Sequence, residues 1–294
     1  MKLLKWAGYA GLFLLSLALG LYMTFPWNAL KDRLLSAASA ESGWRITAER
    51  MRPNWFTGVS LYGFSAAPPK PTDAPPLELD RIDARAHVLG FLTGSRGVTL
   101  RVPVGQGQIW AQLSAREGQQ QLKSTIEDVE LGLVSGLVTL TGLPLSGVVD
   151  GKVNLTISSE NPADSTGSLE LTGTDLELGA GGKIGNYPIP SMRIGSLGWS
   201  IPVQSGKAQI SNQQIRGGDV DLDVDGSISF TLPVERSTMD LSVSFEPSPE
   251  FLQKEPLLKA LLNNIRRARG PDGFYTYGVV GSFRNAKTFP RPRR

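Results

Sequence analysis

Residues Gly218–Phe230 read GDVDLDVDGSISF, and the order of these residues indicates the kind of fold that the chain adopts. From Val220 onward the even positions are apolar, interrupted by Gly226 alone, while the odd positions carry aspartate or serine. Strict alternation over this length is the period of a β-strand whose side chains point in turn to a core and to water. The stretch therefore predicts one long strand with its aspartates on the solvent-facing side.

A calcium site is the first alternative for the same residues. Asp221, Asp223, Asp225 and Gly226 match the opening of a D-x-D-x-D-G calcium loop. Such a loop requires a bidentate glutamate seven residues after the third aspartate, and Leu232 stands there instead. The alternation and the missing glutamate together favour the strand.

A tight hairpin at Asp225-Gly226 is the second alternative, because this dipeptide favours two-residue turns. That turn would set Val224 opposite Ser227, so each face of the hairpin would mix apolar and polar side chains. One uninterrupted strand keeps the two faces distinct and fits the sequence better.

The composition supports a folded β protein and excludes several classes of site. The chain has 294 residues, with 33 Gly, 20 Pro, no Cys and one His, which suits one large β domain or two smaller ones with many turns. Without cysteine there is no disulfide framework and no thiolate metal site. The single histidine, His87, is expected to be an ordinary strand or loop residue.

The charge of the chain is distributed unevenly. Residues 1–27 and 284–294 contain basic residues and no acid, and they leave 23 basic and 27 acidic residues in 28–283. The body is therefore mildly acidic, whereas a nucleic-acid-binding domain carries a basic face. We expect no nucleic-acid partner.

The N-terminus predicts a membrane anchor. Residues 6–27 (WAGYAGLFLLSLALGLYMTFPW) contain no charge, and as a helix they would span about 30 Å, the thickness of the hydrocarbon core of a bilayer. Aromatic residues lie near both ends of this span, and Lys2 and Lys5 precede it, which favours a cytoplasmic tail at 1–5 and an exported body. A cleaved signal peptide with the small-residue site Ala18-Leu19-Gly20 is the alternative, but the apolar run continues beyond it.

Residues 28–43 are expected to form an amphipathic helix behind the anchor. Asn28 is a candidate N-cap, and Leu30, Leu34 and Ala37 or Ala38 recur at helical spacing. The helix is expected to pack on the β body, with the membrane surface as the alternative location.

Residues 44–288 predict a β-rich periplasmic domain built of long antiparallel strands. Alternating segments separated by turn signals follow a Pro-rich linker at 67–76, and GQGQ (105–108) is typical of a hairpin. A phase break is expected at Gly173–Asp175, and glycines at 151, 226 and 281 predict bulges or bends.

Two segments near the C-terminus depart from this pattern. Residues 248–269 predict a helical insertion, with helix starts at Pro249 and Pro256 and a stop at Gly270-Pro271. We expect it to cover an edge or end of the sheet, with a partner-binding or membrane-surface role as the alternative. Residues 289–294 are expected to form a basic C-terminal tail. Its residues 291–294 predict a disordered end, and a contact with acidic headgroups or an acidic partner is the alternative.

The sequence contains no recognisable catalytic motif. A glycine-rich phosphate loop, a G-x-S-x-G elbow and an H-E-x-x-H pair are all absent. The carboxylates Glu127, Asp128 and Glu130 lie in an alternating stretch and are expected on a solvated face, although glycoside hydrolysis needs only two carboxylates. We therefore expect no catalytic, cofactor-binding or metal-binding residues, and a protein that is not an enzyme.

The arrangement of the whole chain is similar to that of a known family. The anchor leads to WRITAERMRPNWFTGVSLYGFSA (44–66), long alternating segments follow, and the chain closes with YGVVGSFRNAKTFPRP (277–292). This resembles the type II secretion system protein N (GspN) family and, more distantly, AsmA-type envelope proteins. The resemblance covers nearly the whole chain as an arrangement, and it carries over no catalytic residue.

The resemblance implies a single-pass protein of the bacterial inner membrane with its body in the periplasm. As a GspN-like protein it would be a structural or accessory subunit of a type II secretion system, with other secretion subunits as partners. As an AsmA-like protein it would handle phospholipid on an open, apolar β groove. The sequence does not distinguish a groove from a closed core, because both need one apolar face.

Overall fold

The computed structural model describes residues 12–291 apart from 14–15, 18–19, 21, 23, 55–56, 69–74, 88–89, 91–93, 117, 135, 138–142, 159, 180–182, 185–186, 189, 233–235 and 283–284. The predicted tail at 1–5 and much of the predicted anchor at 6–27 lie outside these residues. No helix in the described part of the chain is long and apolar enough to cross a membrane. The signal anchor and its cleaved alternative stay predictions.

The described chain confirms the mainly β prediction with one open, 14-stranded antiparallel sheet, whose strands follow each other in chain order. A separate two-stranded ribbon pairs β9 (Lys183–Ile184) with β10 (Tyr187–Pro188). The strands of the large sheet are β1 (Arg45–Asn54), β2 (Gly58–Ala67), β3 (Leu77–Ala86), β4 (Arg96–Val104), β5 (Gly107–Arg116), β6 (Gln119–Glu130), β7 (Leu145–Ser158), β8 (Thr166–Leu178), β11 (Met192–Gln204), β12 (Lys207–Gly217), β13 (Val220–Ser229), β14 (Thr238–Pro247), β15 (Tyr275–Ser282) and β16 (Asn285–Pro290).

The register sorts the side chains of the sheet into two faces. One row of paired residues crosses ten strands, and we call the side of the sheet that carries it the apolar face and the opposite side the polar face. The row consists of Val98, Leu113, Leu122, Leu155, Gly167, Val203, Ala208, Ile228, Met239 and Gly281. The opening stretch is confirmed as a single strand, because β13 runs through Gly226 without a turn.

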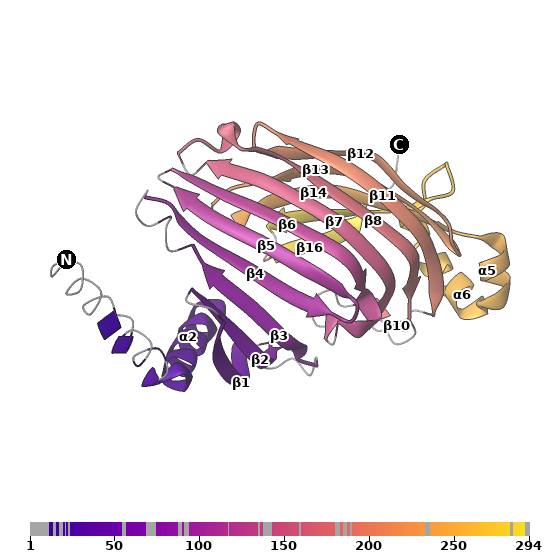
Figure 1. The fold of residues 1–294 in the computed structure, drawn as a ribbon. Coiled ribbons are helices and arrows are strands. Elements are labelled where there is room, and N and C mark those ends of the chain that lie inside the picture. The colour runs from indigo at the N-terminus through magenta and orange to yellow at the C-terminus, as the bar shows by residue number, and fades with distance from the viewer. Residues whose placement is uncertain are drawn as a thin grey trace.

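The sheet curls so that the apolar face lies inside. In Figure 1, β4 to β8 form the wall nearest the viewer, and β16 appears behind β5 and β6. The burial of β11 and β12 identifies the inner face: Ile201, Val203, Ala208 and Ile210 are at most 6% exposed, while the intervening side chains are exposed. Right-handed strand twist accumulated over many strands gives an open sheet this curvature.

β-Bulges help to shape the sheet, and they occur at positions that the sequence indicates only in part. The phase break at Gly173–Asp175 is confirmed, because Asp175 has a φ of 50° and its strand shifts register against both neighbours. Register shifts adjoin Gly151 and Gly226, and in both cases the extra residue lies in the neighbouring strand, β6 or β12. Gly281 adjoins no register shift, and Gly226 and Gly281 adopt a φ of 136°, which other residues rarely reach.

Helix α2 (Trp27–Ser42) matches the helix expected at 28–43 and packs on the β body, as expected. The N-cap position is Pro26, so Asn28 lies inside the helix, and the helix ends at Gly43 in the left-handed conformation. None of its residues is fully buried, and Leu34 is 52% exposed, while Leu30, Leu35 and Ala38 are half-buried. Among the described residues its contact with the sheet is along β1, where Lys31 Nζ donates hydrogen bonds to Ala48 O and Glu49 O.

The helical insertion is confirmed as two short helices, α5 (Pro249–Lys254) and α6 (Pro256–Asn264), followed by the 3₁₀ turn η4 (Arg266–Ala268). Ser248 caps α5 by accepting a hydrogen bond from Phe251 N. The helices lie at the end of the sheet away from α2 (Figure 1) and cover the apolar face there, as expected. Two further 3₁₀ turns, η1 (Leu131–Leu133) and η2 (Pro162–Asp164), lie in connections between strands.

The C-terminal tail expected at 289–294 begins within the sheet, and Arg291, which the sequence predicts in a disordered end, has defined partners. Phe289 and Pro290 belong to the edge strand β16, and Arg291 N donates a hydrogen bond to Thr276 O. The Arg291 guanidinium pairs with Asp240 at 2.7 Å. These residues are ordered by the pairing of β16 with β15 and by this ion pair, although their basic composition alone predicts a solvated end.

Candidate functional site

The apolar face is the most extensive feature that the fold organises, and one part of it is closed. Strands β7 to β14, which we call the closed part, bury a cluster of Leu155, Ile157, Ile201, Val203, Ala208, Ile210 and Phe230. Side chains from β6 and β14, Leu122 and Leu241 among them, pack around this cluster. The main chain tightens the same end of the sheet, because Gly206 N donates to Ser165 O and Phe230 N donates to Gly206 O.

The apolar face of β3 to β6, which we call the open part, is buried at some positions and exposed at others. Val104 is 5% exposed and Val129 is 2% exposed, whereas Leu100 is 38% exposed and Leu113 is 45% exposed. The main contacts of the helices lie elsewhere: α2 contacts β1, and the α5–α6 pair lies against residues of β14 and β15. Leu100 and Leu113 belong to neighbouring strands, and exposed apolar side chains on adjoining strands are a feature of binding and interaction sites.

Trp199 of β11 places a polar group within the apolar face. It pairs with Leu171 in the register and packs against the buried cluster of the closed part. Its indole nitrogen Nε1 is buried and has no hydrogen-bond partner among the described residues. A buried N–H without an acceptor costs about 1–3 kcal/mol, so Trp199 is a polar group that its packed surroundings leave unsatisfied.

The helical end of the apolar face is aromatic. Phe245 and Tyr275 stack with centroids 5.5 Å apart, and Leu262 of α6 and Ala268 of η4 are buried in the same cluster. Burial raises the pKa of the Tyr277 phenol on the neighbouring row above its ordinary value of 10.0. The insertion therefore covers this end with side chains rather than leaving it open.

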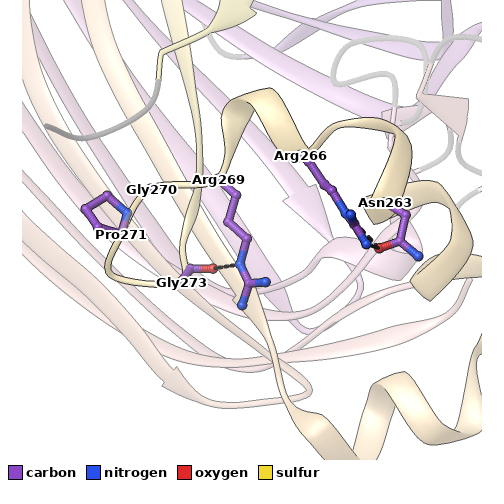
Figure 2. A pocket seen from close by; sticks show the side chains of 6 residues that line it. All are labelled: Asn263, Arg266, Arg269, Gly270, Pro271 and Gly273. Atoms are coloured by element: carbon purple, nitrogen blue, oxygen red, sulfur yellow. Dashed lines mark hydrogen bonds between the residues drawn. The ribbon is translucent and has the colours of Figure 1, made fainter.

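A basic pocket of about 460 Å³ opens beside these helices. Figure 2 shows Arg266 and Arg269 extending to the same side of η4, with the turn Gly270–Gly273 next to them. Arg266 Nη2 donates to Asn263 Oδ1 at 2.9 Å, and Arg269 Nε donates to Gly273 O at 3.2 Å. The lining residues include these two cations and no carboxylate.

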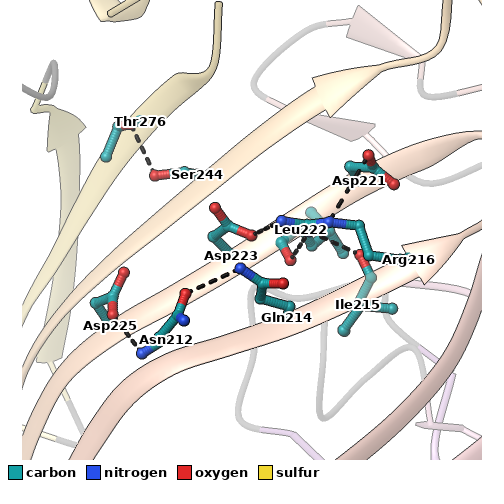
Figure 3. A network of polar contacts seen from close by, with 10 residues as sticks. All are labelled: Asn212, Gln214, Ile215, Arg216, Asp221, Leu222, Asp223, Asp225, Ser244 and Thr276. Atoms are coloured by element: carbon teal, nitrogen blue, oxygen red, sulfur yellow. Dashed lines mark hydrogen bonds and ion pairs between the residues drawn. The ribbon is translucent and has the colours of Figure 1, made fainter. Parts of the chain in front are cut away.

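The polar face of the closed part contains a buried charge that corrects the sequence analysis. Asp223 is 5% exposed and pairs with Arg216, which also donates to Leu222 O at 2.8 Å and lies near the more exposed Asp221 (Figure 3). The prediction that all four aspartates of Gly218–Phe230 are solvated is therefore wrong at Asp223. In the register Asp223 lies between Gln214 of β12 and Ser244 of β14.

Two small hydroxyl side chains continue this polar network away from Asp223. Ser244 and Thr276 are at most 1% exposed and hydrogen-bond to each other at 2.8 Å, as Figure 3 shows. In the register Ser244 stands opposite both Asp223 and Thr276. Each polar group therefore has a partner, as buried polar groups require.

His87 lies in a second hollow, on the polar face of β2 to β6. Its Nε2 is 2.8 Å from Thr99 Oγ1, and the hollow of about 650 Å³ is also lined by Arg101, Gln108 and Trp110. Arg101 Nε donates to Gln108 Oε1, whose amide donates to Glu127. His87 is thus a loop residue with a hydroxyl partner, which agrees with the sequence expectation.

The carboxylates considered for catalysis are dispersed. Glu127, Asp128 and Glu130 are exposed, and Asp128 sits in a bulge with a φ of 48°, where its N–H donates to Asp150. No group of three or more potential metal-ligating side chains occurs within the described ranges.

Sequence reasoning missed Trp199, Arg266 and Arg269 as candidate site residues. The alternation places Trp199 on the apolar face, but only the packing reveals that its N–H lacks an acceptor. Arg266 and Arg269 lie near the C-terminus of the predicted helix, where cations interact favourably with the helix dipole. The sequence therefore contains no separate indication that they form a pocket. No family model, no curated protein and no solved structure matches the chain.

Proposed function

We propose that this protein is a non-enzymatic, membrane-anchored envelope protein that holds phospholipid acyl chains on the apolar face of its curled sheet. The single observation that supports this most is the open part of that face. A sheet with one apolar side is normally covered by a second layer of structure. Over β4 and β5 leucines are instead 38% and 45% exposed, although they continue the register row of the core.

Acyl chains match this surface in chemistry and shape. Each buried methylene is stabilised by about 0.8 kcal/mol, so a chain lying along the open part would supply the apolar cover that the protein omits. The buried N–H of Trp199 lacks a hydrogen-bond acceptor among the described residues, and an ester carbonyl of a glycerolipid would supply one. The predicted anchor at 6–27 would keep the body beside the inner membrane, on its periplasmic side, which supplies the lipid.

The test is the lipid content of the full chain after extraction from membranes. Native mass spectrometry should find about one or more phospholipids per wild-type chain. The double substitution Leu100→Glu and Leu113→Glu places two charges on the open part, and it should remove most of the bound lipid because charges in an apolar site are costly.

A matched control carries the same charges on the other face. Gln112→Glu and Gln121→Glu lie on β5 and β6 on the polar face, and this variant should keep its lipid. Circular dichroism should report an intact sheet for both variants. A consistently lipid-free wild-type chain would exclude the proposal.

A scaffolding subunit of a type II secretion system is the second candidate, and the unequal edges of the sheet favour it. The β1 edge is covered, since Lys31 and Ser39 of α2 bond its main chain. Every residue of the β16 edge is exposed, and an uncovered edge strand is a template for pairing with another chain.

Site-specific photocrosslinking distinguishes this second candidate. A photoreactive residue at Lys287 of β16 should capture other secretion subunits, whereas one at Arg33 on the exposed side of α2 should not. Intact secretion in a deletion strain together with no adduct at Lys287 would argue against a secretion role.

A further inference from the structure

We infer that the basic pocket at the helical end binds the phosphate of an anionic phospholipid headgroup, an inference that rests on the proposed lipid function. The pocket is formed by Asn263, Arg266, Arg269 and the turn that follows. Its position relative to the apolar face, the orientation of its arginines and their free donors each support this assignment.

The pocket adjoins the apolar face through one side chain. The Arg269 guanidinium carbon lies 5.7 Å from the ring centroid of Tyr275, and Tyr275 is buried in the aromatic cluster of the helical end. The ring of Phe245 also stacks on the ring of Tyr275, with the two centroids 5.5 Å apart. The pocket therefore lies beside the covered, aromatic end of the apolar face, and its exposed arginines are accessible to a headgroup phosphate from the solvent side.

The 3₁₀ turn determines the orientation of the two arginines. Side chains three residues apart eclipse each other in a 3₁₀ helix, so Arg266 and Arg269 extend to one side of η4 (Figure 2). Asn263 Oδ1 accepts hydrogen bonds from Nε and Nη2 of Arg266, and Gly273 O accepts a hydrogen bond from Nε of Arg269. The arrangement is preorganised, which lowers the entropy lost when an anion binds.

Neither arginine makes an ion pair within the described residues, although Glu246 Oε1 and Arg269 Nη2 both lie within 4 Å of the point that a Cβ on Gly273 would occupy. Arg216, in contrast, pairs with Asp223 on the polar face. Two carboxylates flank the turn: Asp272 accepts a hydrogen bond from Phe274 N, and Glu246 lies next to Gly273. Arg266 and Arg269 keep outer N–H groups to donate, and arginine forks match phosphate oxygens.

The surrounding segment has the charge that an anionic lipid requires. Residues 249–269 contain five basic and two acidic residues, whereas the body as a whole is acidic. Leu257 at the start of α6 is 75% exposed, so an apolar side chain accompanies the cations on the outer side of the insertion. Adjacent cations and an exposed leucine are the combination found at lipid interfaces.

The experiment compares the lipids bound by three forms of the full chain in detergent. Each is incubated with vesicles of equal parts phosphatidylglycerol and phosphatidylethanolamine, recovered, and examined by mass spectrometry. The pocket variant carries Arg266→Gln and Arg269→Gln. The control carries Lys259→Gln and Arg267→Gln, which remove the same charge from exposed positions outside the pocket lining.

The wild type and the control should enrich phosphatidylglycerol by about tenfold, equivalent to about 1.4 kcal/mol, because both lipids carry a phosphate but the ammonium of phosphatidylethanolamine is repelled by the two arginines. The pocket variant should bind the same total amount of lipid without enrichment. Equal enrichment in all three forms would overturn the inference and leave the lipid function standing. Absence of lipid from all three would overturn both.

Titration with inorganic phosphate separates a lipid headgroup from free phosphate as the ligand. In one outcome, the pocket variant releases no heat when phosphate is added and yet binds the same lipids as the wild type. That result would show that the pocket binds free phosphate and that the headgroup assignment is wrong. Loss of phosphatidylglycerol enrichment together with weaker phosphate binding supports the headgroup.

Discussion

Two leucines in one register row of the apolar face have different environments. Leu113 of β5 is 45% exposed, and Leu155 of β7, two strands further along the row, is 5% exposed. Their chemistry, strand setting and face are the same, so neither propensity nor alternation separates them. The curl of the sheet separates them, because the strands of the closed part pack their own apolar side chains around Leu155.

The polar face, like the apolar face, is more buried in the closed part than in the open part. In the closed part Asp223 and Ser244 are buried, as is Thr276 of the adjacent β15, while Lys123 and Glu127 on the polar face of the open part are exposed. The closed part therefore provides most of the stability of the sheet, and the open part provides accessible surface. A single sheet can combine both because its curvature, unlike its alternation, need not be uniform.

The largest expected effect compares the two leucines directly. Leu155→Ala should lower the free energy of unfolding by about 3 kcal/mol, because it leaves a cavity in a packed cluster. Leu113→Ala should cost less than about 1 kcal/mol, because solvent already reaches the side chain. Urea unfolding of the full chain in detergent, followed by tryptophan fluorescence, measures both. Equal losses would show that the open part is covered in solution.

The second prediction concerns the buried charge on the polar face. Asp223→Asn should lower the free energy of unfolding by about 2 kcal/mol, because Arg216 would lose its charged partner. Arg216 is 37% exposed, so water would replace only part of that interaction. Asp221→Asn is the matched control, because that carboxylate is 43% exposed and 3.8 Å from the same arginine. Its cost should be below about 0.5 kcal/mol. A control as costly as Asp223→Asn would contradict the distinction between the two aspartates.

The third prediction has opposite signs for stability and for lipid binding. Trp199→Phe keeps an aromatic ring on the apolar face but removes the buried N–H that has no acceptor. The lipid-free chain should become more stable by up to about 1 kcal/mol, less any loss of packing, while lipid retention should fall. Thermal unfolding with and without added phospholipid measures the two effects. A variant that loses stability and keeps its lipid would refute the role given to this donor.

The smallest expected effect is a pH dependence at the helical end of the closed part. Hydrogen bonds from the Arg193 main chain and guanidinium to Asp219 hold the pKa of this carboxyl below its ordinary value of 3.8. A lowered pKa in the folded state adds stability above the unfolded value, and this stability is lost as the pH falls through the folded value.

Asp219→Asn tests that assignment. The variant should be less stable than the wild type by about 1 kcal/mol at neutral pH, and the difference should shrink below pH 3.8 as Asp219 becomes protonated. Unfolding curves between pH 3 and pH 7 follow it. A difference that is independent of pH would show that the carboxylate charge contributes nothing.

Much of the architecture follows from local sequence patterns. The alternation over 218–230, the turn at GQGQ and the phase break at Gly173–Asp175 each correspond to observed elements. The prolines at 249 and 256 begin α5 and α6. These features depend on near neighbours in the chain, because backbone geometry and strand period act over a few residues.

The errors arise where a distant strand or helix supplies the partner. Alternation places Asp223 with its exposed neighbours, yet Arg216 of the adjacent strand allows it to be buried. Leu34 lies at helical spacing for an apolar stripe, yet α2 docks through Lys31 onto carbonyls of β1. Basic composition predicts a free tail, yet Arg291 pairs with Asp240. In each case a side chain is ordered by a group that is remote in the sequence.

The sequence by itself determined that the chain forms long antiparallel strands with one apolar face, since a period of two assigns each residue to a side wherever the strand lies. The tertiary structure alone decided how much of that face is closed, which aspartate is buried and that Arg266 and Arg269 share a pocket. Those properties depend on the curvature accumulated over 14 strands and on where the helical insertion folds back, and both are sums over many contacts rather than properties of any one segment.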